Sequence, residues 1–293
     1  MNLNQLRVFH AAAKLLNFTR AAEELHLTQP GISKHLKDLE EYYRTPLFER
    51  AGKKVALTQA GTALYVATTA AFTLFDSAKS CIDDIIGLAG GRLTIGTGVT
   101  IGTYILPAKL VSFRQRYPGI EIKVETALSR QTTERVLNNS VELGLVAHYA
   151  PDPRLEAQPF MRDRLALVVS PGHPWVRRKT AISLKEFGSQ ALLVSKRGSG
   201  TWRIIETLMA QKGFQPGSII ELGTTEAVKQ AVAANLGISL LSRHVLEREL
   251  TSGTITAIPL TGGEPSRDLY LITHKGRYLT QAARAFVELL FEA

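Results

Sequence analysis

The stretch from Leu3 to Thr58 contains three short helical patterns followed by a small basic hairpin, and this arrangement constrains the fold more than any other feature of the chain. Thr28 can cap the third helix, and Pro30 fits its first turn, where no backbone hydrogen-bond donor is lost. We therefore predict a helix from about Gln29 to Glu41. Its apolar stripe consists of Ile32, Leu36 and Leu39, and its polar face of Gln29, Pro30, Ser33, Lys34 and Lys37.

That polar face carries side chains that can read DNA bases in a groove. Glutamine pairs with adenine edges, lysine with guanine or phosphate, serine with several bases, and a proline ring can pack on a thymine methyl group. Most polar helix faces contact only water, so the face alone does not decide. The preceding sequence favours DNA binding, because it predicts two more helices and a tight turn. Their residues are Leu6, Phe9, Ala13 and Leu16 in the first helix, Thr19 as the cap of the second with Ala21, Ala22 and Leu25, and His26 with Leu27 in the turn.

The segment after these helices is predicted to form a β-hairpin. Its strands are Phe48–Arg50 and Val55–Leu57, joined around Gly52, with Lys53 and Lys54 at the tip. Lysines at that position would lie beside a phosphate backbone, as in the wing of a winged helix-turn-helix. On its own, the hairpin is equally compatible with a surface turn whose lysines only increase solubility.

Several motifs of this region match one protein family. They are Asn4-Gln5-Leu6-Arg7-Val8-Phe9, Phe18-Thr19-Arg20-Ala21-Ala22, Thr28-Gln29-Pro30-Gly31-Ile32-Ser33-Lys34-His35-Leu36-Lys37-Asp38-Leu39-Glu40 and Leu47-Phe48-Glu49-Arg50. Together they resemble the amino-terminal domain of LysR-type transcriptional regulators, and the length and downstream layout of the chain agree.

The resemblance implies a regulator that binds double-stranded promoter DNA. The residues expected to approach base edges are Gln29, Pro30, Ser33 and Lys34, with Lys37 on the same face. Those expected to hold phosphates or to reach the minor groove are Thr28, Arg50, Lys53 and Lys54. The resemblance also implies a dimer that assembles into tetramers, and it leaves contact with RNA polymerase open.

Charge and composition are compatible with this interpretation but do not require it. The chain has 35 basic and 26 acidic side chains, a net charge of +9 and an isoelectric point near 9.7, which favour attraction to polyanions. No apolar run is long enough to span a bilayer, and Arg7, His10 and Lys14 interrupt any signal-peptide core, so we expect a cytoplasmic protein without membrane contact. The single cysteine, Cys81, excludes an internal disulfide and a cysteine-rich zinc site.

One long helix is predicted from about Gln59 to Ile86. Its apolar positions repeat in heptads, at Leu64, Ala71, Ala78 and Ile85 and again at Ala67, Leu74, Cys81 and Leu88. This seam favours pairing with a second copy, although a helix packed on its own domain is the alternative, because so few heptads make a short coiled coil. The resemblance supports the dimer, since LysR-type regulators pair through this helix. Cys81 is then a small packed residue rather than a redox sensor.

Ala89-Gly90-Gly91 breaks the long helix and leads into alternating strands and helices, which predict an α/β region with doubly wound sheets. The predicted strands are Leu93–Gly96, Ile120–Glu125, Leu143–Ala147, Leu165–Ser170, Ala191–Ser195, Ile219–Leu222, Ile238–Leu241 and Leu269–His274. The predicted helices are Leu106–Arg116, Thr133–Asn139, Thr201–Lys212, Thr225–Ala234 and Thr280–Phe291. Two similar motifs, Glu142-Leu143-Gly144-Leu145-Val146 and Asn235-Leu236-Gly237-Ile238-Ser239, suggest two similar lobes.

The predicted fold class is therefore α/β, with three parts. They are a winged helix-turn-helix at residues 1–58, a linker and dimerisation helix at 59–89, and a two-lobed effector domain at 92–293. The resemblance implies that this effector domain is like periplasmic binding proteins, with crossovers near Arg162 and Arg267. Lobe I would comprise 92–162 and 267–293, and lobe II 163–266.

Two glycine-containing loops are candidates for an effector site. Gly96-Thr97-Gly98-Val99-Thr100-Ile101-Gly102 and Lys196-Arg197-Gly198-Ser199-Gly200-Thr201 each join a strand to a helix, where free amides and the helix dipole attract a small carboxylate, sulfate or phosphate. The threonines are equally compatible with simple helix caps and the glycines with turns. By the resemblance, Thr100, Ser129, His148 and Thr201 are candidate effector residues, although a histidine is not typical of its slot. Arg197 and Ser199 are further candidates, because the second loop supplies a cation and a hydroxyl there.

An enzyme is not predicted. Gly96, Gly98 and Gly102 do not have the dinucleotide-binding spacing, no Walker lysine follows a glycine loop, and the histidines lack metal-ligand spacing, so we expect no cofactor and no metal. The remaining alternative is a small-molecule binding or transport protein of periplasmic type, which the region from Arg92 would fit alone. The helix-turn-helix discriminates against it. We expect effector binding between the lobes to change the assembly and its hold on DNA.

Overall fold

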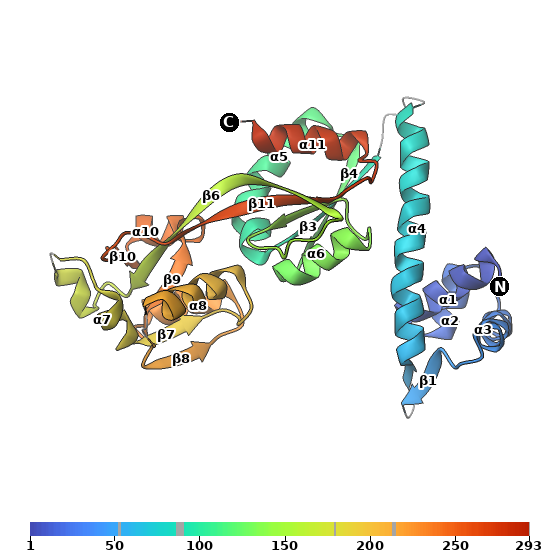
Figure 1. Cartoon of the computed structure of the whole chain (residues 1–293), viewed down its shortest axis with the longest axis horizontal. Coiled ribbons are helices and arrows are strands. Elements are labelled where there is room, and N and C mark those ends of the chain that lie inside the picture. The colour runs from blue at the N-terminus through green and yellow to red at the C-terminus, as the bar shows by residue number, and fades with distance from the viewer. Residues whose placement is uncertain (52–53, 86–90, 179, 213–214, 293) are drawn as a thin grey trace. The chain divides into compact units, whose positions relative to one another are not determined.

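The computed structural model of the chain describes residues 1–51, 54–85, 91–178, 180–212 and 215–292 (Figure 1). The chain divides into two compact units, one formed by Met1–Ile85 and one formed by Ile86–Leu137 with Val141–Ala293. Within the described stretches, no helix is long and apolar enough to cross a membrane.

The first unit begins with the three predicted helices, α1 (Leu3–Leu15), α2 (Phe18–Glu24) and α3 (Gln29–Tyr43). The Thr28 hydroxyl accepts a hydrogen bond from the amide of Gly31 at the start of α3, with Pro30 in the first turn, as predicted. The predicted cap of α2 was wrong, because the helix starts at Phe18 and the side chain of Asn17 accepts the capping bond from Arg20.

The wing follows α3 as two antiparallel strands, β1 (Phe48–Ala51) and β2 (Lys54–Leu57). It is fixed to α3 by Glu40, whose Oε1 accepts hydrogen bonds from the amides of Leu47 and Phe48 at 2.7 and 3.2 Å. The ring of Phe48 packs against Phe9 of α1 and Phe18 of α2. Wing and helices therefore share one core, which holds the hairpin at a fixed place beside α3.

The long helix α4 (Gln59–Ile85) continues from the wing and agrees with the predicted helix. It packs on α1 through His10, whose Nδ1 lies 3.2 Å from the hydroxyl of Thr68 and whose ring stacks on Tyr65. Burial, with a smaller contribution from Lys14, lowers the pKa of His10, so the imidazole is held neutral in this contact. One side of α4 is thus occupied within its own unit.

The second unit has a first lobe built on the parallel strands β3 (Gly91–Thr97), β4 (Ile120–Thr126) and β5 (Leu143–Val146). The helices α5 (Leu106–Arg116) and α11 (Gln281–Phe291) cover one face of this sheet, and α6 (Ser129–Leu137) covers the other (Figure 1). Phe113 and Phe286 are fully buried between sheet and helices and pack edge to face. We call this part lobe I.

The other part of the unit, called lobe II, has the same alternation of strands and helices. Its strands are β7 (Ala191–Val194), β8 (Ser218–Glu221), β9 (Ser239–Ser242) and β10 (Thr256–Ile258). Its α-helices are α7 (Leu184–Gly188), α8 (Gly200–Lys212), α9 (Thr225–Ala233) and α10 (Glu247–Ser252), with short 3-10 turns at Pro174–Arg177 (η2) and Arg243–Val245 (η3). Two buried apolar clusters make its core, one of them around Trp175, Phe187 and Trp202.

Two long strands run through both lobes, β6 (Leu155–Val169) and β11 (Ser266–His274) (Figure 1). The first part of β6 pairs with β11, and its last part pairs with β9 and β10. The sheet is therefore mixed rather than purely parallel. The predicted strand at Leu165–Ser170 was too short, because residues 155–164 are mostly exposed and lack an apolar run. The register shift between Leu269 and Tyr270 lies opposite Pro159, a residue found at such irregularities.

Candidate functional site

The face of α3 that carries the predicted base-reading residues points away from the core of its unit. Ile32, Leu36 and Leu39 are buried, whereas Thr28, Gln29, Pro30, Lys34 and Lys37 are exposed and Ser33 is half-buried. The side-chain amide of Gln29 donates to the Ser33 hydroxyl at 3.0 Å, which orients both side chains one turn apart. The helix therefore presents a polar surface free to enter a groove.

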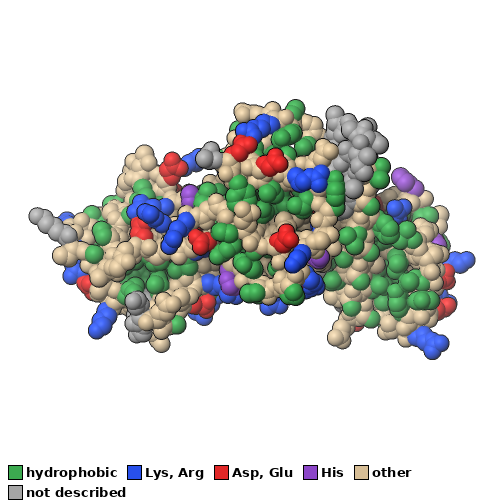
Figure 2. All heavy atoms as spheres, turned by 45° about the horizontal axis from the view of Figure 1, so that its top comes forward, with side chains coloured by type: hydrophobic (Ala, Val, Ile, Leu, Met, Phe, Trp, Pro, Cys, Tyr) green, Lys and Arg blue, Asp and Glu red, His purple; other side chains and the backbone are tan. Residues whose placement is uncertain are grey.

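Two of the remaining predicted DNA contacts belong to the strands of the wing. Arg50 is in β1 and Lys54 in β2, and Lys53 lies outside the described residues. Lys37 is 3.7 Å from Glu41, but both side chains are largely exposed, so this pair is weak and leaves Lys37 available to a phosphate. On the face shown in Figure 2, basic side chains are interspersed with acidic and apolar ones, so the net charge is not gathered into a single patch there.

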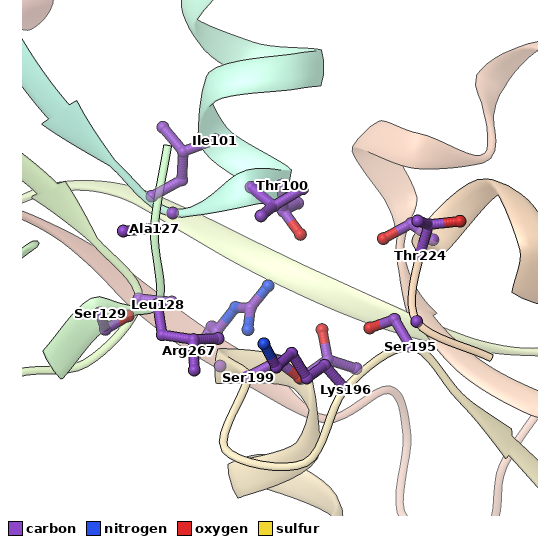
Figure 3. A pocket seen from close by; sticks show the side chains of 17 residues that line it. Thr100, Ile101, Ala127, Leu128, Ser129, Ser195, Lys196, Ser199, Thr224 and Arg267 are labelled. Atoms are coloured by element: carbon purple, nitrogen blue, oxygen red, sulfur yellow. The ribbon is translucent and has the colours of Figure 1, made fainter. Parts of the chain in front are cut away.

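A cavity of about 180 Å³ lies between the lobes of the second unit. Its walls are the loops after β3, β4 and β5 in lobe I, the loops after β7 and β8 in lobe II, and Arg267 of β11. Ligands of open α/β folds bind beyond the carboxyl ends of the strands, and the cavity has this position. Figure 3 shows the Thr100 hydroxyl and the Arg267 guanidinium directed into the same space, with Ser195 and Thr224 across from Thr100.

Four helical segments have their amino-terminal ends at this cavity. They are the π-helical turn η1 (Ile101–Ile105), which leads into α5, and the helices α6, α8 and α9. The Ser199 hydroxyl accepts the amide of Trp202, and the Thr224 hydroxyl accepts the amide of Ala227, so these two act as caps. Thr100 makes no side-chain capping bond. Its hydroxyl is therefore available to a ligand at a converging set of positive helix ends.

Arg267 brings a cation to the cavity from a buried ion pair. Its Nε and Nη2 lie 2.9 and 2.8 Å from Oδ2 of Asp163, whose Oδ1 accepts the hydroxyl of Ser242 at 2.6 Å. Asp163 is fully buried and the Arg267 side chain is 8% exposed. A Cβ atom at Gly200 would lie 2.7 Å from Nη1 of Arg267 and 2.6 Å from Cβ of Ala147, so only glycine leaves room for the guanidinium beside α8.

The family of the chain follows from comparison with known proteins. Residues 3–62 match the family model described as bacterial regulatory helix-turn-helix protein, lysR family, and residues 87–293 match the model described as LysR substrate binding domain. The chain belongs to the LysR family of transcriptional regulators. The family predicted from the sequence is confirmed, as is the prediction that the chain is not an enzyme, because the relatives of this LysR regulator are transcriptional regulators.

Three similar proteins span all or most of this LysR regulator. The HTH-type transcriptional activator CmpR of Synechocystis sp. is 34% identical over 289 residues, which cover 99% of this chain and 94% of CmpR. The regulatory domain of Synechocystis PCC6803 CcmR, solved in complex with 2-PG, is 29% identical with a TM-score of 0.64 and covers 69% of this chain and 96% of that domain. Full-length CbnR, solved with its target DNA, shares the fold at 21% identity and a TM-score of 0.73, with 99% of both chains covered.

The comparisons also decide between the two classes of protein left open by the sequence. A binding or transport protein of periplasmic type would account only for the region from Arg92 onward, whereas the helix-turn-helix model matches residues 3–62 and the similarity to CmpR extends over nearly the whole chain. The DNA-binding regulator is the class that fits both parts.

The predicted effector residues of this LysR regulator divide into two groups. Thr100, Ser129, Ser199 and Thr201 line the cavity together. Arg197 does not line it, because its side chain lies 3.7 Å from Glu221 and 5.4 Å above the ring of Trp202. The cation of that loop that lines the cavity is its neighbour Lys196.

His148 lines a second cavity of about 300 Å³, and its Nε2 lies 2.7 Å from Nη1 of Arg203. Sequence reasoning included Lys196 in a candidate loop without selecting it as an effector residue, and it named Arg267 only as a crossover between the lobes. The signal available for Arg267 was a charged residue just before the predicted strand Leu269–His274, together with the Arg162-Asp163-Arg164 run just before the predicted strand Leu165–Ser170. The strand pairing that joins them was not visible in the sequence. Among the described residues, no group of three or more histidine, cysteine, aspartate or glutamate side chains could hold a metal.

Proposed function

We propose that this LysR regulator controls transcription in response to a small organic acid with two anionic groups, such as 2-phosphoglycolate, bound in the cavity between its lobes. The single observation that supports this proposal is the chemistry of the walls, where Lys196, Arg267 and four helix amino termini converge and no acidic residue occurs among the described lining. Cationic side chains and free amides at helix starts are the groups that bind carboxylates and phosphates.

The size of the cavity supports the same ligand class. Drug-sized ligands occupy about 300–1,000 Å³, whereas this cavity holds about 180 Å³. It fits an acid of a few carbon atoms whose two charged ends reach Arg267 and Lys196. The CcmR regulatory domain, which is 29% identical, was solved in complex with 2-PG. The hydroxyls of Thr100, Ser129 and Thr201 would supply the neutral hydrogen bonds.

Isothermal titration of the full chain with 2-phosphoglycolate tests the effector proposal, with glycolate and inorganic phosphate as single-charge-group probes. Of the three molecules, only 2-phosphoglycolate is expected to bind strongly. At a free concentration of one hundred times Kd, it would stabilise the native state by about 2.7 kcal/mol. Thr100→Val should weaken this binding by roughly tenfold, because a hydrogen bond to a charged ligand is lost. Thr103→Val is the matched control, since Thr103 lies in the same helical turn and does not line the cavity. Equal binding by all three molecules, or no effect of Thr100→Val, would reject the proposed site.

We propose that α3 reads operator DNA through Gln29, Pro30, Ser33 and Lys34, with Thr28, Lys37, Arg50, Lys53 and Lys54 on the phosphates. Residues 1–58 would bind DNA, 59–89 would dimerise and 92–293 would respond to the effector, with lobe I at 92–162 and 267–293 and lobe II at 163–266. In a two-fold dimer, the two α3 helices would enter successive major grooves about one helical turn apart. Assembly into tetramers and contact with RNA polymerase complete the proposed set of partners.

Ser33→Ala is expected to reduce discrimination between operator and random DNA by about 1–3 kcal/mol, because a base contact is lost. Lys54→Ala should instead weaken binding to all sequences alike. It should also reduce the slope of the logarithm of the binding constant against the logarithm of the salt concentration by about one unit. Fluorescence anisotropy with operator and scrambled duplexes at several salt concentrations measures both quantities. If Ser33→Ala lowered affinity for both duplexes equally, Ser33 would not be a base-reading residue.

The dimer is proposed to form through α4. The side of α4 away from His10 carries an apolar stripe, defined here as Ala67, Ala71, Leu74, Phe75, Ala78 and Ile82, with Leu74, Phe75 and Ile82 exposed by 50, 56 and 58%. The stripe contains four of the eight predicted heptad positions, Ala67, Ala71, Leu74 and Ala78. Leu64 instead packs on the core of its own unit, and the side chains of Cys81 and Ile85 and residue Leu88 lie outside the described part of the chain. Exposed apolar side chains in a row favour pairing with a second copy.

The effector is proposed to act on a contact between the lobes. Tyr104, one turn after Thr100, donates a hydrogen bond of 2.5 Å to Glu226, the residue after Thr225 in α9. Burial and this hydrogen bond raise the pKa of Tyr104 to about 12, so the phenol stays a donor at neutral pH. A ligand held by Thr100 and Thr225 would favour one arrangement of η1 relative to α9, the two helices that carry Tyr104 and Glu226. The resulting shift in free energy can be no larger than the difference in the ligand's binding free energy between the two arrangements.

A further inference from the structure

We propose that the second cavity of this LysR regulator, between α6 and α8, binds a monocarboxylate with an apolar body through Arg203 and His148. The proposal rests on the geometry of this cavity and on membership of the family. It does not depend on the identity of the effector proposed above, because different side chains would hold the two ligands.

The second cavity is a separate space on the interlobe boundary. It encloses about 300 Å³, more than the first cavity, and is bounded by α6 and the segment after β5 in lobe I and by the start of α8 in lobe II. Only Ser129 and Gly200 line both cavities. A ligand in the second space would therefore contact both lobes without occupying the site of the first.

Of the two arginines that line the second cavity, Arg203 has no anionic partner among the described residues. Arg203 is bonded to the ring nitrogen Nε2 of His148 at 2.7 Å, and no carboxylate in the described part of the chain forms an ion pair with it. The acidic side chains nearby are already paired, Glu134 with Arg130 at 2.9 Å and Asp152 with Arg154 at 2.8 Å. An added carboxylate would thus meet one uncompensated guanidinium, whose fork of donors matches a carboxylate in two parallel hydrogen bonds.

His148 would assist such a ligand. Since Arg203 only donates, Nε2 of His148 must accept in the empty cavity, and burial together with Arg203 lowers the pKa of the imidazole. A bound carboxylate would separate the two groups and favour protonated His148, so binding should take up a proton. The other charged groups that line this space are Arg130, Glu134 and Asp152. Arg154 and His274 lie close to Asp152, and the hydrogen bonds from Arg154 lower the pKa of Asp152 to about 2, so that carboxylate stays charged.

The remaining lining suits an apolar body. Leu137, Tyr149 and Pro151 line the cavity, and the ring of Tyr149 is held edge to face against Tyr270 with centroids 5.1 Å apart. An aromatic or branched aliphatic group would pack there, while its carboxylate reached the start of α8. This chemistry differs from that of the first cavity, where two cations and several hydroxyls favour a smaller and more highly charged molecule.

The test is isothermal titration of the full chain with phenylacetate, and with phenylacetamide as the neutral isostere. We expect one phenylacetate per chain, no binding of phenylacetamide, and tighter binding at about pH 6 than at about pH 8, because binding takes up a proton at His148 and is therefore favoured at the lower pH. Arg203→Met should weaken phenylacetate binding by roughly tenfold to hundredfold, and His148→Gln should remove the proton uptake. Arg177→Met, which removes an exposed arginine of η2, is the matched control.

The outcomes separate this proposal from that on the effector. Unchanged phenylacetate binding in Thr100→Val, and in the presence of saturating 2-phosphoglycolate, would support a second site. Displacement of phenylacetate by 2-phosphoglycolate, equal affinity of Arg203→Met and the unaltered chain, or no heat of binding up to about 10 mM would overturn it. Melting curves of each variant establish that Arg203→Met and His148→Gln remain folded, which is expected because Arg203 is exposed and His148 only half-buried.

Discussion

Arg267→Met is expected to abolish binding of 2-phosphoglycolate and to lower the free energy of unfolding by about 3–5 kcal/mol. The loss of binding follows because the guanidinium lines the effector cavity. The loss of stability follows because Asp163, which is fully buried, would keep its hydroxyl contact to Ser242 but lose its only ion pair among the described residues. Chemical denaturation and isothermal titration on the same preparation measure the two effects.

A double variant separates the two roles of Arg267. Asp163→Asn combined with Arg267→Met removes the buried unpaired charge and keeps an acceptor for the Ser242 hydroxyl, so it should recover most of the stability but none of the binding. Lys196→Met is the complementary variant, since Lys196 is exposed and should weaken binding without a loss of stability. Retained 2-phosphoglycolate binding in Arg267→Met would show that the effector does not contact this side chain.

The combined variant Leu74→Arg with Ile82→Arg is expected to give a monomer whose affinity for operator DNA falls by about 10²–10⁴. The side chains of Leu74 and Ile82 are exposed within the apolar stripe of α4, so charges there should not affect the fold of their own unit. Two guanidinium groups facing their copies would instead prevent helix pairing. The affinity for DNA falls strongly because each monomer then binds its half-site independently. In a dimer, binding of one half-site raises the effective concentration of the second helix-turn-helix at the other half-site.

Sedimentation velocity and operator binding measure these consequences together. Leu74→Met with Ile82→Met is the matched control, because it preserves apolar volume and should leave both the dimer and DNA binding intact. A dimer that persists with two arginines in the stripe would move the interface to another surface of the chain. Unaltered melting of the variant would show that the charges act on assembly rather than on folding.

Much of the DNA-binding unit could be predicted because its signals are local. The cap at Thr28 and the proline after it fix the start of α3, and the spacing of Ile32, Leu36 and Leu39 fixes its buried face within one helix. The wing and α4 were predicted for the same reason. The cap of α2 was misplaced by two residues in a segment where Asn17 and Thr19 can both accept a capping bond in principle.

The effector cavity was predicted only in part. Thr100, Ser199 and Thr201 were found because each lies at the start of a helix after a strand, a relation that the chain order reveals. Ser129 came from the family resemblance, since its helix was predicted to begin only at Thr133 but begins at Ser129. The sequence could not decide whether Lys196 or Arg197 lines the cavity, since both follow the same strand. In the structure, Arg197 lies over the ring of Trp202 and beside Glu221, and so does not line the cavity.

The sequence by itself determined the family, the order of helices and strands in the DNA-binding unit and the polar face of α3, because these depend on residues close together along the chain. In the second unit it left out α7, α10, β10 and the first part of β6. The tertiary structure alone decided that Arg267 of β11 meets Asp163 of β6 beside Thr100, and that His148 meets Arg203 in a separate space. Those partners are brought together by strand pairing and by the meeting of two lobes. Long-range pairing of this kind depends on the packing of the whole unit, so a single sequence leaves many partners open for each charged side chain.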